Sequence, residues 1–248
     1  MTGRHKPTRP DFGPKAARYD ELRPADENWH ELVRVLVREG DLRGQRVLDV
    51  GCGTGRLVTA LAEHARVWGV DPSPEMLDVA RTRTPAGVGL KRGRAEDLPF
   101  KEGWFDRVVC QLVIHLIERP RGFAEAHRVL VPEGRIAIAT FDPSHFDAYW
   151  LNRFFPTLEA RDRARFPTEE ELHAELERAG FSVRMLRLSQ SDTIGREEAL
   201  LRVRGRHIST LDLLDDEEYE AGLARAEREL PERVEYASEW LIAVGERT

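Results

Sequence analysis

The segment RVLDVGCGTGRL, residues 46–57, places three glycines between an apolar run and a helix-like run. Its first part, RVLDV (46–50), has the composition of a buried strand, and RLVTALAEHA (56–65) has the spacing of a helix. Glycine has no Cβ, so a ligand can lie against the backbone and a tight turn can use positive φ. The helix that follows presents unpaired N–H groups and the positive end of its dipole. The segment therefore predicts a strand, a tight turn and a helix that together bind a carboxylate or a phosphate.

The spacing of the glycines separates two classes of ligand site. Dinucleotide-binding turns follow GxGxxG, in which the third glycine lets the helix pack closely on the strand. This chain has Gly51, Gly53 and Gly55 followed by Arg56, so the dinucleotide spacing fails by one position. The turn therefore disfavours, without excluding, an NAD-dependent oxidoreductase.

An acidic residue ends the second expected strand, RVWGVD (66–71). Asp71 follows the glycine turn by roughly 20 residues, the distance at which doubly wound proteins place the acid that accepts both ribose hydroxyls. The alternative role is a cap for the helix expected over residues 73–83. Ser73 and Pro74 already provide that helix with an N-cap and a first residue. We therefore favour the ribose contact.

Strands and helices alternate strictly through the first 142 residues, after a helix expected from Asp26 to Glu39. The strands are expected at 46–50, 66–71, 88–93, 105–114 and 134–142, and the intervening helices at 56–65, 73–83 and 120–130. Such alternation requires right-handed crossovers, which produce a parallel sheet that helices cover on both faces. The fold class is therefore α/β.

The pattern changes after residue 142. Residues 143–167 are expected to form loops or short helices, and Thr168 and Glu171 form a capping box for a helix over 168–180. A strand is expected at 181–189, a helical stretch at 196–230 and a last strand at 236–247. The helical stretch is an insert before the last strand.

Composition limits the class of protein. The 248 residues include 41% hydrophobic residues, carry a net charge of −6 and contain two cysteines. No apolar run approaches the roughly 20 residues that span a bilayer, and the polar N-terminus is not a signal peptide. The acidic balance argues against a nucleic-acid partner, and two cysteines form neither a disulfide framework nor a conventional zinc site. We expect a cytoplasmic protein, monomeric or homodimeric, without a membrane partner or a metal.

The N-terminal arm, residues 1–18, is basic. Its basic residues are Arg4, His5, Lys6, Arg9, Lys15 and Arg18, against one acid, Asp11. We expect a solvated tail; the alternative is an arm that contacts an anionic partner.

Five ordered motifs resemble those of class I S-adenosylmethionine-dependent methyltransferases, in particular the small-molecule branch called type 11. The motifs are VLDVGCGTGRL, VDPSPEML, GRAEDLPF, FDRVVCQLVIHL and RVLVPEGRIAIAT, which lie within about residues 45–142. The resemblance implies a doubly wound, Rossmann-like sheet, mostly parallel with an antiparallel last strand, and a small helical cap. It also implies one domain (19–248), with a cofactor-binding core at 41–142 and acceptor-side and C-terminal elements at 143–248.

The resemblance further implies which residues hold S-adenosylmethionine and its product S-adenosylhomocysteine. The methionine end would lie against the glycine turn and Asp49, and the ribose against Asp71. Met76 and Ala95 would contact the adenine, Cys110 and Gln111 the methionine ammonium, and Tyr19 would close over the cofactor. The implied cofactor-binding residues are Tyr19, Asp49, Gly51, Gly53, Gly55, Asp71, Met76, Ala95, Glu96, Cys110 and Gln111.

One residue departs from the family pattern. Arg94 stands where the family usually has an acid that accepts from the adenine amino group, and a guanidinium can only donate. Glu96 or Asp97, a backbone carbonyl, or shape alone would then have to hold the adenine.

Aromatic residues gather in the segment that, in this family, commonly builds part of the acceptor pocket. They are Phe141, Phe146, Tyr149, Trp150, Phe154, Phe155 and Phe166. We expect an apolar or aromatic small-molecule acceptor, with Tyr149 and Trp150 in the pocket wall; the alternative is ordinary core packing.

His115 and His145 are the candidate catalytic bases, since each follows a strand near the expected site; the alternative for each is a structural role. We expect the acidic run DLLDDEEYE (212–220) to be the solvated start of a helix, because acids favour helix N-termini; the alternative is a site for a cationic substrate or a metal.

The expected reaction is an in-line transfer of a methyl group to a small molecule, in which the protein mainly aligns the reacting groups. Two alternatives stay open. One is a cofactor-binding protein without turnover, for which Arg94 is the only argument. The other is the NAD-dependent oxidoreductase.

Overall fold

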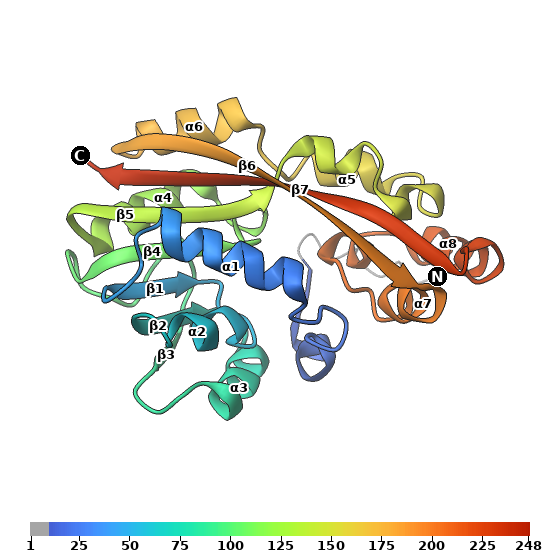
Figure 1. Cartoon of the computed structure of the whole chain (residues 1–248), viewed down its shortest axis with the longest axis horizontal. Helices are drawn as coiled ribbons and strands as arrows, with labels where there is room; N and C mark the ends of the chain where they lie inside the picture. The colour runs from blue at the N-terminus through green and yellow to red at the C-terminus, as the bar shows by residue number, and fades with distance from the viewer. Residues whose placement is uncertain (1–9) are drawn as a thin grey trace, which may run out of the picture.

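The strands form one seven-stranded sheet in the order β3-β2-β1-β4-β5-β7-β6 (Figure 1). This computed structural model describes residues 10–248. The strands are β1 (Arg46–Val50), β2 (Arg66–Asp71), β3 (Gly89–Arg92), β4 (Phe105–Gln111), β5 (Leu130–Phe141), β6 (Phe181–Gly195) and β7 (Arg233–Arg247). The first five are parallel, and β7 runs antiparallel to both of its neighbours. The expected α/β fold, with an antiparallel last strand, is confirmed.

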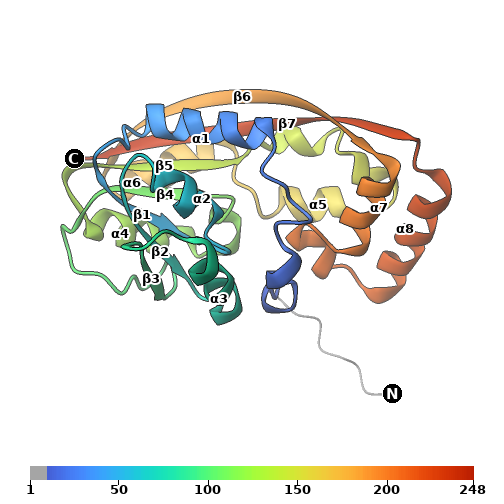
Figure 2. The same ribbon diagram turned by 60° about the horizontal axis from the view of Figure 1, so that its bottom comes forward.

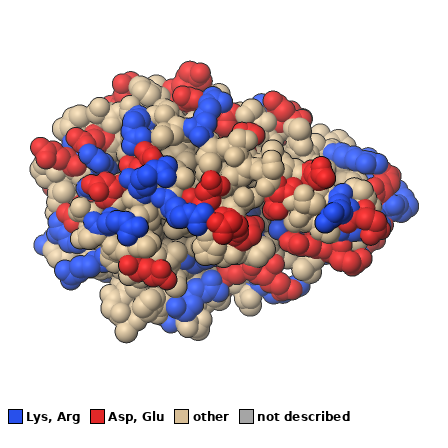
Figure 3. Space-filling model, in the orientation of Figure 1, with Lys and Arg blue, Asp and Glu red and all other residues tan. Residues whose placement is uncertain are grey.

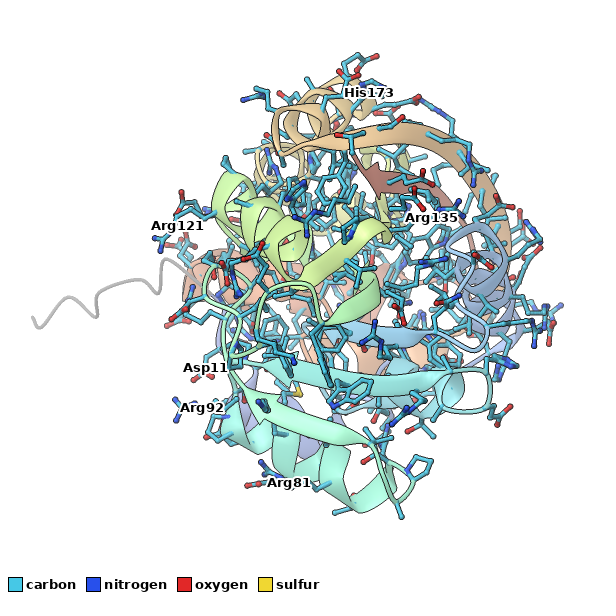
Figure 4. All side chains as sticks on the ribbon, turned by 90° about the vertical axis from the view of Figure 1, so that its left-hand side faces the viewer. Asp11, Arg81, Arg92, Arg121, Arg135 and His173 are labelled. Carbon is cyan, nitrogen blue, oxygen red and sulfur yellow. The ribbon has the colours of Figure 1, made fainter. Side chains whose placement is uncertain are left out.

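Helices cover both faces of the sheet, because successive strand residues point to opposite faces. The helices are α1 (Glu27–Glu39), α2 (Arg56–Leu61), α3 (Pro74–Arg83), α4 (Arg119–Val129), α5 (Leu158–Arg163), α6 (Glu169–Arg178), α7 (Arg196–Arg204) and α8 (Asp216–Glu229). Val47 packs with α1, α2 and α3 in one apolar cluster, whereas Leu48 packs with α4 and α6 in another. Figure 4 shows Arg121 of α4 and His173 of α6 pointing away from the sheet. The sheet therefore lies between two apolar layers.

The caps that the sequence predicts are formed. Ser73 accepts a hydrogen bond from the Met76 amide at the start of α3. Thr168 and Glu171 make both hydrogen bonds of the capping box before α6. Asp215 accepts from the amide of Glu218 at the start of α8, so the acidic run is indeed a helix start.

The last two strands are longer than the sequence pattern predicts. β6 and β7 pair from Phe181 and Arg247 to Gly195 and Arg233, well beyond the ends of the other strands (Figure 1). The helices α7 and α8 lie in the chain between Gly195, where β6 ends, and Arg233, where β7 begins. They pack with α5 (Figure 2). We call residues 143–167 and 196–232 the insert.

The insert has its own apolar core, and its second half is not one helical stretch. Phe154, Phe155 and Tyr219 are among the residues of that core. Gly205 caps α7 and Arg206 has a φ of +48°, so the chain turns before α8 begins. The prediction of continuous helix over 196–230 is therefore wrong between the two helices.

The segment from residue 10 to residue 26, which precedes α1, lies between the core and the insert (Figure 2). It contacts α3 of the core and, through Lys15, the insert. Lys15 Nζ lies 2.5 Å from Asp212 Oδ2 and donates to the Arg206 carbonyl at 2.7 Å. Lys15 is thus a fixed, largely buried contact, and the prediction of a solvated tail is wrong at this residue. Arg18 is exposed and pairs with Glu21, whereas Arg4, His5, Lys6 and Arg9 lie outside the described residues.

Surface charges of both signs are interspersed over the face in Figure 3. Many form ion pairs, such as Arg184 with Glu39 and Arg187 with Glu169. Among the described residues, no helix has both the length and the apolar composition needed to cross a lipid bilayer.

Candidate active site

The glycine turn after β1 has a backbone that side chains would disrupt. Gly51 and Gly53 have φ values of +76° and +52°, in the left-handed region that favours glycine. A Cβ on Gly51 would lie 2.5 Å from Val113 Cγ2, so this position must stay bare for packing. A Cβ on Gly53 would meet no protein atom within 4 Å. Gly53 therefore leaves space for a ligand instead of for a neighbouring side chain.

Asp71 fixes this turn from the end of β2. Its Oδ2 accepts a hydrogen bond from the Gly53 amide at 2.9 Å, and its Oδ1 accepts from the Ser73 amide at 2.9 Å. Burial raises the pKa of Asp71 above its usual value. The two hydrogen bonds lower that pKa, but by less than burial raises it. Because Ser73 itself caps α3, Asp71 is not the helix cap, and its carboxyl group lines the cavity described next.

A cavity of about 400 Å³ opens beside the turn, at the carboxyl ends of β1, β2 and β4. We call it the cofactor cavity. Of the predicted cofactor-binding residues, it is lined by Tyr19, Gly51, Gly53, Asp71, Met76, Ala95, Glu96 and Gln111. Asp11 also lines it, and Figure 4 shows Asp11 and Arg92 on the same side of the molecule. The cavity is large enough for a nucleoside-sized ligand.

Three predicted residues do not line the cofactor cavity. Asp49 lines a smaller cavity of about 70 Å³ next to it, together with Gly51, Gly53 and Gln111. Gly55 is the N-cap of α2, where a Cβ would lie 2.9 Å from Ala80 Cβ. The Cys110 side chain is buried in the sheet, and burial raises the pKa of its thiol.

Asp49 is a buried acid that forms no ion pair with any of residues 10–248. Its Oδ2 has no hydrogen-bond partner, and burial, with a smaller contribution from Asp71, raises the pKa of Asp49 to about 8. A buried carboxyl group in this state is expected to bind a cation or a hydrogen-bond donor, which would relieve the cost of its burial. This orphaned atom, beside the open face of Gly53, fits a ligand with an ammonium group.

Glu96 is held by protein groups although it lines the cofactor cavity. Its Oε1 accepts from the Glu118 amide at 2.9 Å, and its Oε2 lies 3.3 Å from Arg94 Nε. Burial alone would raise the pKa of Glu96, but the Glu118 amide and Arg94 outweigh it and hold that pKa below its usual value. Arg94 is half exposed, and it is also a lining residue of the cofactor cavity.

A second cavity, of about 190 Å³, adjoins the first; we call it the acceptor cavity. Five residues line both cavities: Phe12, Tyr19, Gln111, Leu112 and Leu116. The apolar wall of the acceptor cavity includes Phe141, Phe146, Phe166 and Trp240. The two cavities meet where β4 ends.

Of the two predicted wall residues, Tyr149 lines the acceptor cavity and Trp150 does not. Trp150 packs against the core of the insert and stacks on His207, with ring centroids 6.3 Å apart. Phe154 and Phe155 are also in the insert core. The aromatic cluster therefore serves both roles that the sequence left open.

His145 lines the acceptor cavity, but its ring is bound to β7. Its Nδ1 accepts from the Glu239 amide at 3.5 Å, and its ring makes a second hydrogen bond to the Ala237 backbone. Its ring also stacks on Phe141 at 4.0 Å, and burial lowers its pKa to about 4. These contacts argue for a structural role and against a catalytic base.

His115 is less constrained. Its ring stacks on Phe166 with centroids 4.1 Å apart and lines the acceptor cavity. Its Nδ1 is buried without a hydrogen-bond partner. Burial, and then the charges of Arg165 and Arg23, lower the pKa of His115 well below its usual value. A neutral imidazole therefore stands in the cavity wall at neutral pH.

Two kinds of lining residue carry no recognisable signal in the sequence. Leu112 lines all three cavities and has a φ of +50°, which ends β4 at Gln111 instead of at the expected residue 114. No local sequence signal marks such strain in a leucine. The insert residues Asp162, His207 and Thr210 also line the acceptor cavity, and only the tertiary structure brings them there.

Comparison with known proteins places the motifs in a family. Residues 48–138 match the family model described as a methyltransferase domain. An uncharacterized methyltransferase of Synechocystis is 36% identical over 169 residues, which are 64% of this chain and 76% of that protein. A chloroplastic 2-methyl-6-phytyl-1,4-hydroquinone methyltransferase of rice is 35% identical over 169 residues, 66% of this chain and 45% of that protein.

The match to an uncharacterized methyltransferase of Mycobacterium tuberculosis is 43% identical over 95 residues, 38% of this chain, and it spans only 39% of that relative's length. Among solved structures, an Anabaena variabilis protein described as a putative methyltransferase from an antibiotic biosynthesis pathway aligns with a TM-score of 0.70 and 24% identity. That alignment covers 86% of this chain and 96% of the other. Likeness at this level of identity concerns the fold alone.

Proposed function

The chain belongs to the class I S-adenosylmethionine-dependent methyltransferases, and we propose that it transfers a methyl group to a small, apolar or aromatic molecule. One observation carries this proposal: the cofactor cavity opens into a second, aromatic-walled cavity at Gln111 and Leu112. Two adjoining cavities are what a reaction between a bound cofactor and a separate acceptor requires.

The residues of the first cavity suit S-adenosylmethionine. Asp49 would face the ammonium of the methionine part, which would compensate its unpartnered oxygen. Asp71 would accept from the ribose hydroxyls. Met76 and Ala95, which are buried apolar residues of the cavity wall, would contact the adenine.

Methyl transfer requires little acid–base catalysis by the protein. When bound, S-adenosylmethionine supplies a methyl group already activated by a positive sulfur. The aromatic wall excludes water, and Tyr19, which lines both cavities, helps to separate the site from solvent. His115 is the candidate to accept a proton from the acceptor, where the attacking atom must lose one.

The chemistry of the acceptor cavity supports a neutral acceptor. Its charged lining residues balance by sign, with arginines 23, 56 and 202 against aspartates 26, 162 and 192. Its volume, about 190 Å³, suits a small molecule or one end of a longer one. The relative from rice is described as methylating a hydroquinone, which is aromatic and neutral.

Transfer of labelled methyl groups from S-adenosylmethionine to a panel of small phenols and hydroquinones tests the proposal. Phe166→Leu should lower kcat/KM for the preferred acceptor about tenfold, because Phe166 contacts both the cavity and His115. Phe154→Leu is the matched control: it removes the same atoms from the insert core and should leave kcat/KM within about threefold. An equal loss in both variants, or transfer to no compound, would contradict the aromatic acceptor.

Neither alternative function has an observation in its favour. Binding without turnover was suggested by Arg94, whose side chain lines the cofactor cavity and pairs with Glu96. The NAD-dependent oxidoreductase is wrong, because the family is that of the methyltransferases. The cytoplasmic location and the monomeric or homodimeric state stay predictions from the sequence.

A further inference from the structure

The insert gives the acceptor cavity a polar side. Tyr149 precedes a short 3₁₀ helix of the insert, and His207 follows α7. Both residues line the acceptor cavity, and neither lines the cofactor cavity. Nothing in the transfer of a methyl group between the two cavities requires them. Their side chains nevertheless form a partly buried hydrogen bond, with Tyr149 Oη 3.3 Å from His207 Nε2.

The direction of this hydrogen bond follows from the other side of the imidazole ring. His207 Nδ1 lies 3.0 Å from the carbonyl oxygen of Arg202. A carbonyl can only accept, so Nδ1 carries the ring proton. Burial, followed by the charges of Arg23 and Arg202, lowers the pKa of His207 well below its usual value, so the ring stays neutral. Nε2 then has a lone pair and no proton, and Tyr149 must be the donor.

The consequence is that Tyr149 has no proton left for a ligand. Its oxygen keeps its acceptor capacity, and Tyr149 is a lining residue of the acceptor cavity. Tyr236, which also lines the cavity, differs in this respect. Its hydroxyl donates to Asp192 Oδ2 at 2.8 Å and accepts from Arg202 Nη1 at 3.0 Å, so both of its roles are filled.

We propose that Tyr149 and His207 form a specificity pair that selects acceptors with a hydroxyl or an N–H group remote from the methylated atom. His207 orients the Tyr149 hydroxyl, and the Tyr149 oxygen accepts the hydrogen bond from the acceptor. The acceptor then has two parts: an apolar or aromatic part along Phe141 and Phe166, and a neutral donor that reaches the insert. The inference rests on the proposed function and deepens it, because it names a chemical feature of the substrate.

Matched pairs of compounds test this selection. The probes are 4-hydroxyphenyl alkanols and the ethers in which only the chain alcohol is methylated. Affinity is measured by calorimetry with the protein saturated with S-adenosylhomocysteine, and transfer is measured with S-adenosylmethionine. The wild-type protein should favour the alcohol at least tenfold, because the ether has no proton for Tyr149. The chain alcohol itself should stay unmethylated in the product.

Two tyrosine variants separate recognition from stability. Tyr149→Phe should reduce the preference to less than about threefold while its affinity for S-adenosylhomocysteine stays that of the wild type. Tyr219→Phe is the control, since Tyr219 donates to the Val203 carbonyl in the insert and does not line the cavity. It should keep the full preference for the alcohol.

Nitrogen NMR of histidine-labelled protein gives a readout that needs no acceptor. His207 should show a protonated Nδ1 and an unprotonated, hydrogen-bonded Nε2, and the Nε2 resonance should move toward that of a free lone pair in Tyr149→Phe. A proton on Nε2 in the wild type would overturn the inference.

The remaining outcomes distinguish the inference from the proposed function. Binding of S-adenosylhomocysteine with no preference for the alcohol overturns the inference alone. Methylation of the chain alcohol also overturns it, since Tyr149 would then stand at the reacting atom. Failure to bind S-adenosylhomocysteine overturns the proposed function as well.

Discussion

The cofactor cavity and the acceptor cavity meet at Gln111 and Leu112, but they come from different parts of the chain. Most of the first is lined by a short span of sequence, residues 50–117, at the carboxyl ends of neighbouring strands. The second is lined mainly by residues from the N-terminal segment, the end of β5, the insert and the long antiparallel pair β6 and β7. A bare glycine turn forms part of the first cavity, whereas no glycine among residues 10–248 lines the second. Substitutions should therefore separate cofactor binding from acceptor selection.

The largest effect is expected at Asp71. Asp71→Ala removes the acceptor for two ribose hydroxyls and also the hydrogen bond that holds the Gly53 amide. The affinity for S-adenosylhomocysteine should fall about 100-fold, since a hydrogen bond to a charged group contributes about 1.5–3 kcal/mol. Calorimetric titration measures it.

Asp78→Ala is the control for Asp71, because Asp78 lies on α3 and pairs with the exposed Arg81. Its affinity for S-adenosylhomocysteine should match that of the wild type. A loss of less than about threefold in Asp71→Ala would place the ribose elsewhere.

A smaller effect, about tenfold, is expected at Gly53. Gly53→Ala and Gly103→Ala both put a Cβ at a residue with positive φ and no protein atom nearby, so each should lower the free energy of unfolding by about 1–2 kcal/mol. Of these two glycines, Gly53 lines the cofactor cavity and Gly103 does not. Gly53→Ala should therefore bind S-adenosylhomocysteine about tenfold more weakly, and Gly103→Ala as the wild type does. Equal affinities in calorimetry would mean that no ligand lies against this backbone.

Asp49 should make cofactor binding depend on pH. Its pKa is about 8 in the ligand-free protein, so the carboxyl group is mostly protonated at pH 7. A bound ammonium favours the carboxylate, so binding near pH 7 should release about one proton, and affinity should rise as the pH approaches 8. Calorimetry in buffers of different ionisation enthalpy counts the proton, and Asp49→Asn should release none. Equal proton release in both proteins would assign the proton to another group.

The raised pKa of Asp49 also makes the free energy of unfolding depend on pH. Because the pKa of Asp49 is raised above its unfolded value near 4, the folded ligand-free protein binds more protons than the unfolded chain between pH 4 and 8. The contribution of Asp49 to stability is thus greatest below pH 4 and is lost as the pH rises through 8. Denaturant unfolding of the wild type against Asp49→Asn should show this slope only in the wild type.

The smallest effect is expected at Arg94. Its guanidinium is half exposed, and Glu96 keeps a second hydrogen bond, from the Glu118 amide, when Arg94 is removed. Arg94→Ala should change the affinity for S-adenosylhomocysteine by less than about threefold. A tenfold loss would show that Arg94 contacts the cofactor. The adenine would then be held by an arginine at the position where the family usually has an acid.

The glycine turn of the cofactor cavity and the helix caps could be predicted from the sequence, because each depends on a short, local pattern. A turn such as Gly51–Gly55 works only with fixed spacing, and the capping residues Ser73 and Thr168 act within a few positions, so short patterns revealed them. The parallel sheet followed from the alternation of strands and helices, and its antiparallel last strand followed from the family resemblance, whereas the order of the strands was not predicted.

The acceptor side left weaker traces in the sequence. Tyr149 and Trp150 are adjacent and chemically alike, yet only the tertiary structure decides which one lines the cavity. His115 and His145 looked equivalent until the β7 backbone was seen to bind one of them. Lys15 looked solvated because its partner, Asp212, lies almost 200 residues away.

The most direct test of the account is a calorimetric titration of the purified protein with S-adenosylhomocysteine, and with NAD under the same conditions. We expect one site per chain, with a dissociation constant in the micromolar range for S-adenosylhomocysteine and no binding of NAD. The absence of binding to S-adenosylhomocysteine at millimolar concentration would contradict the account.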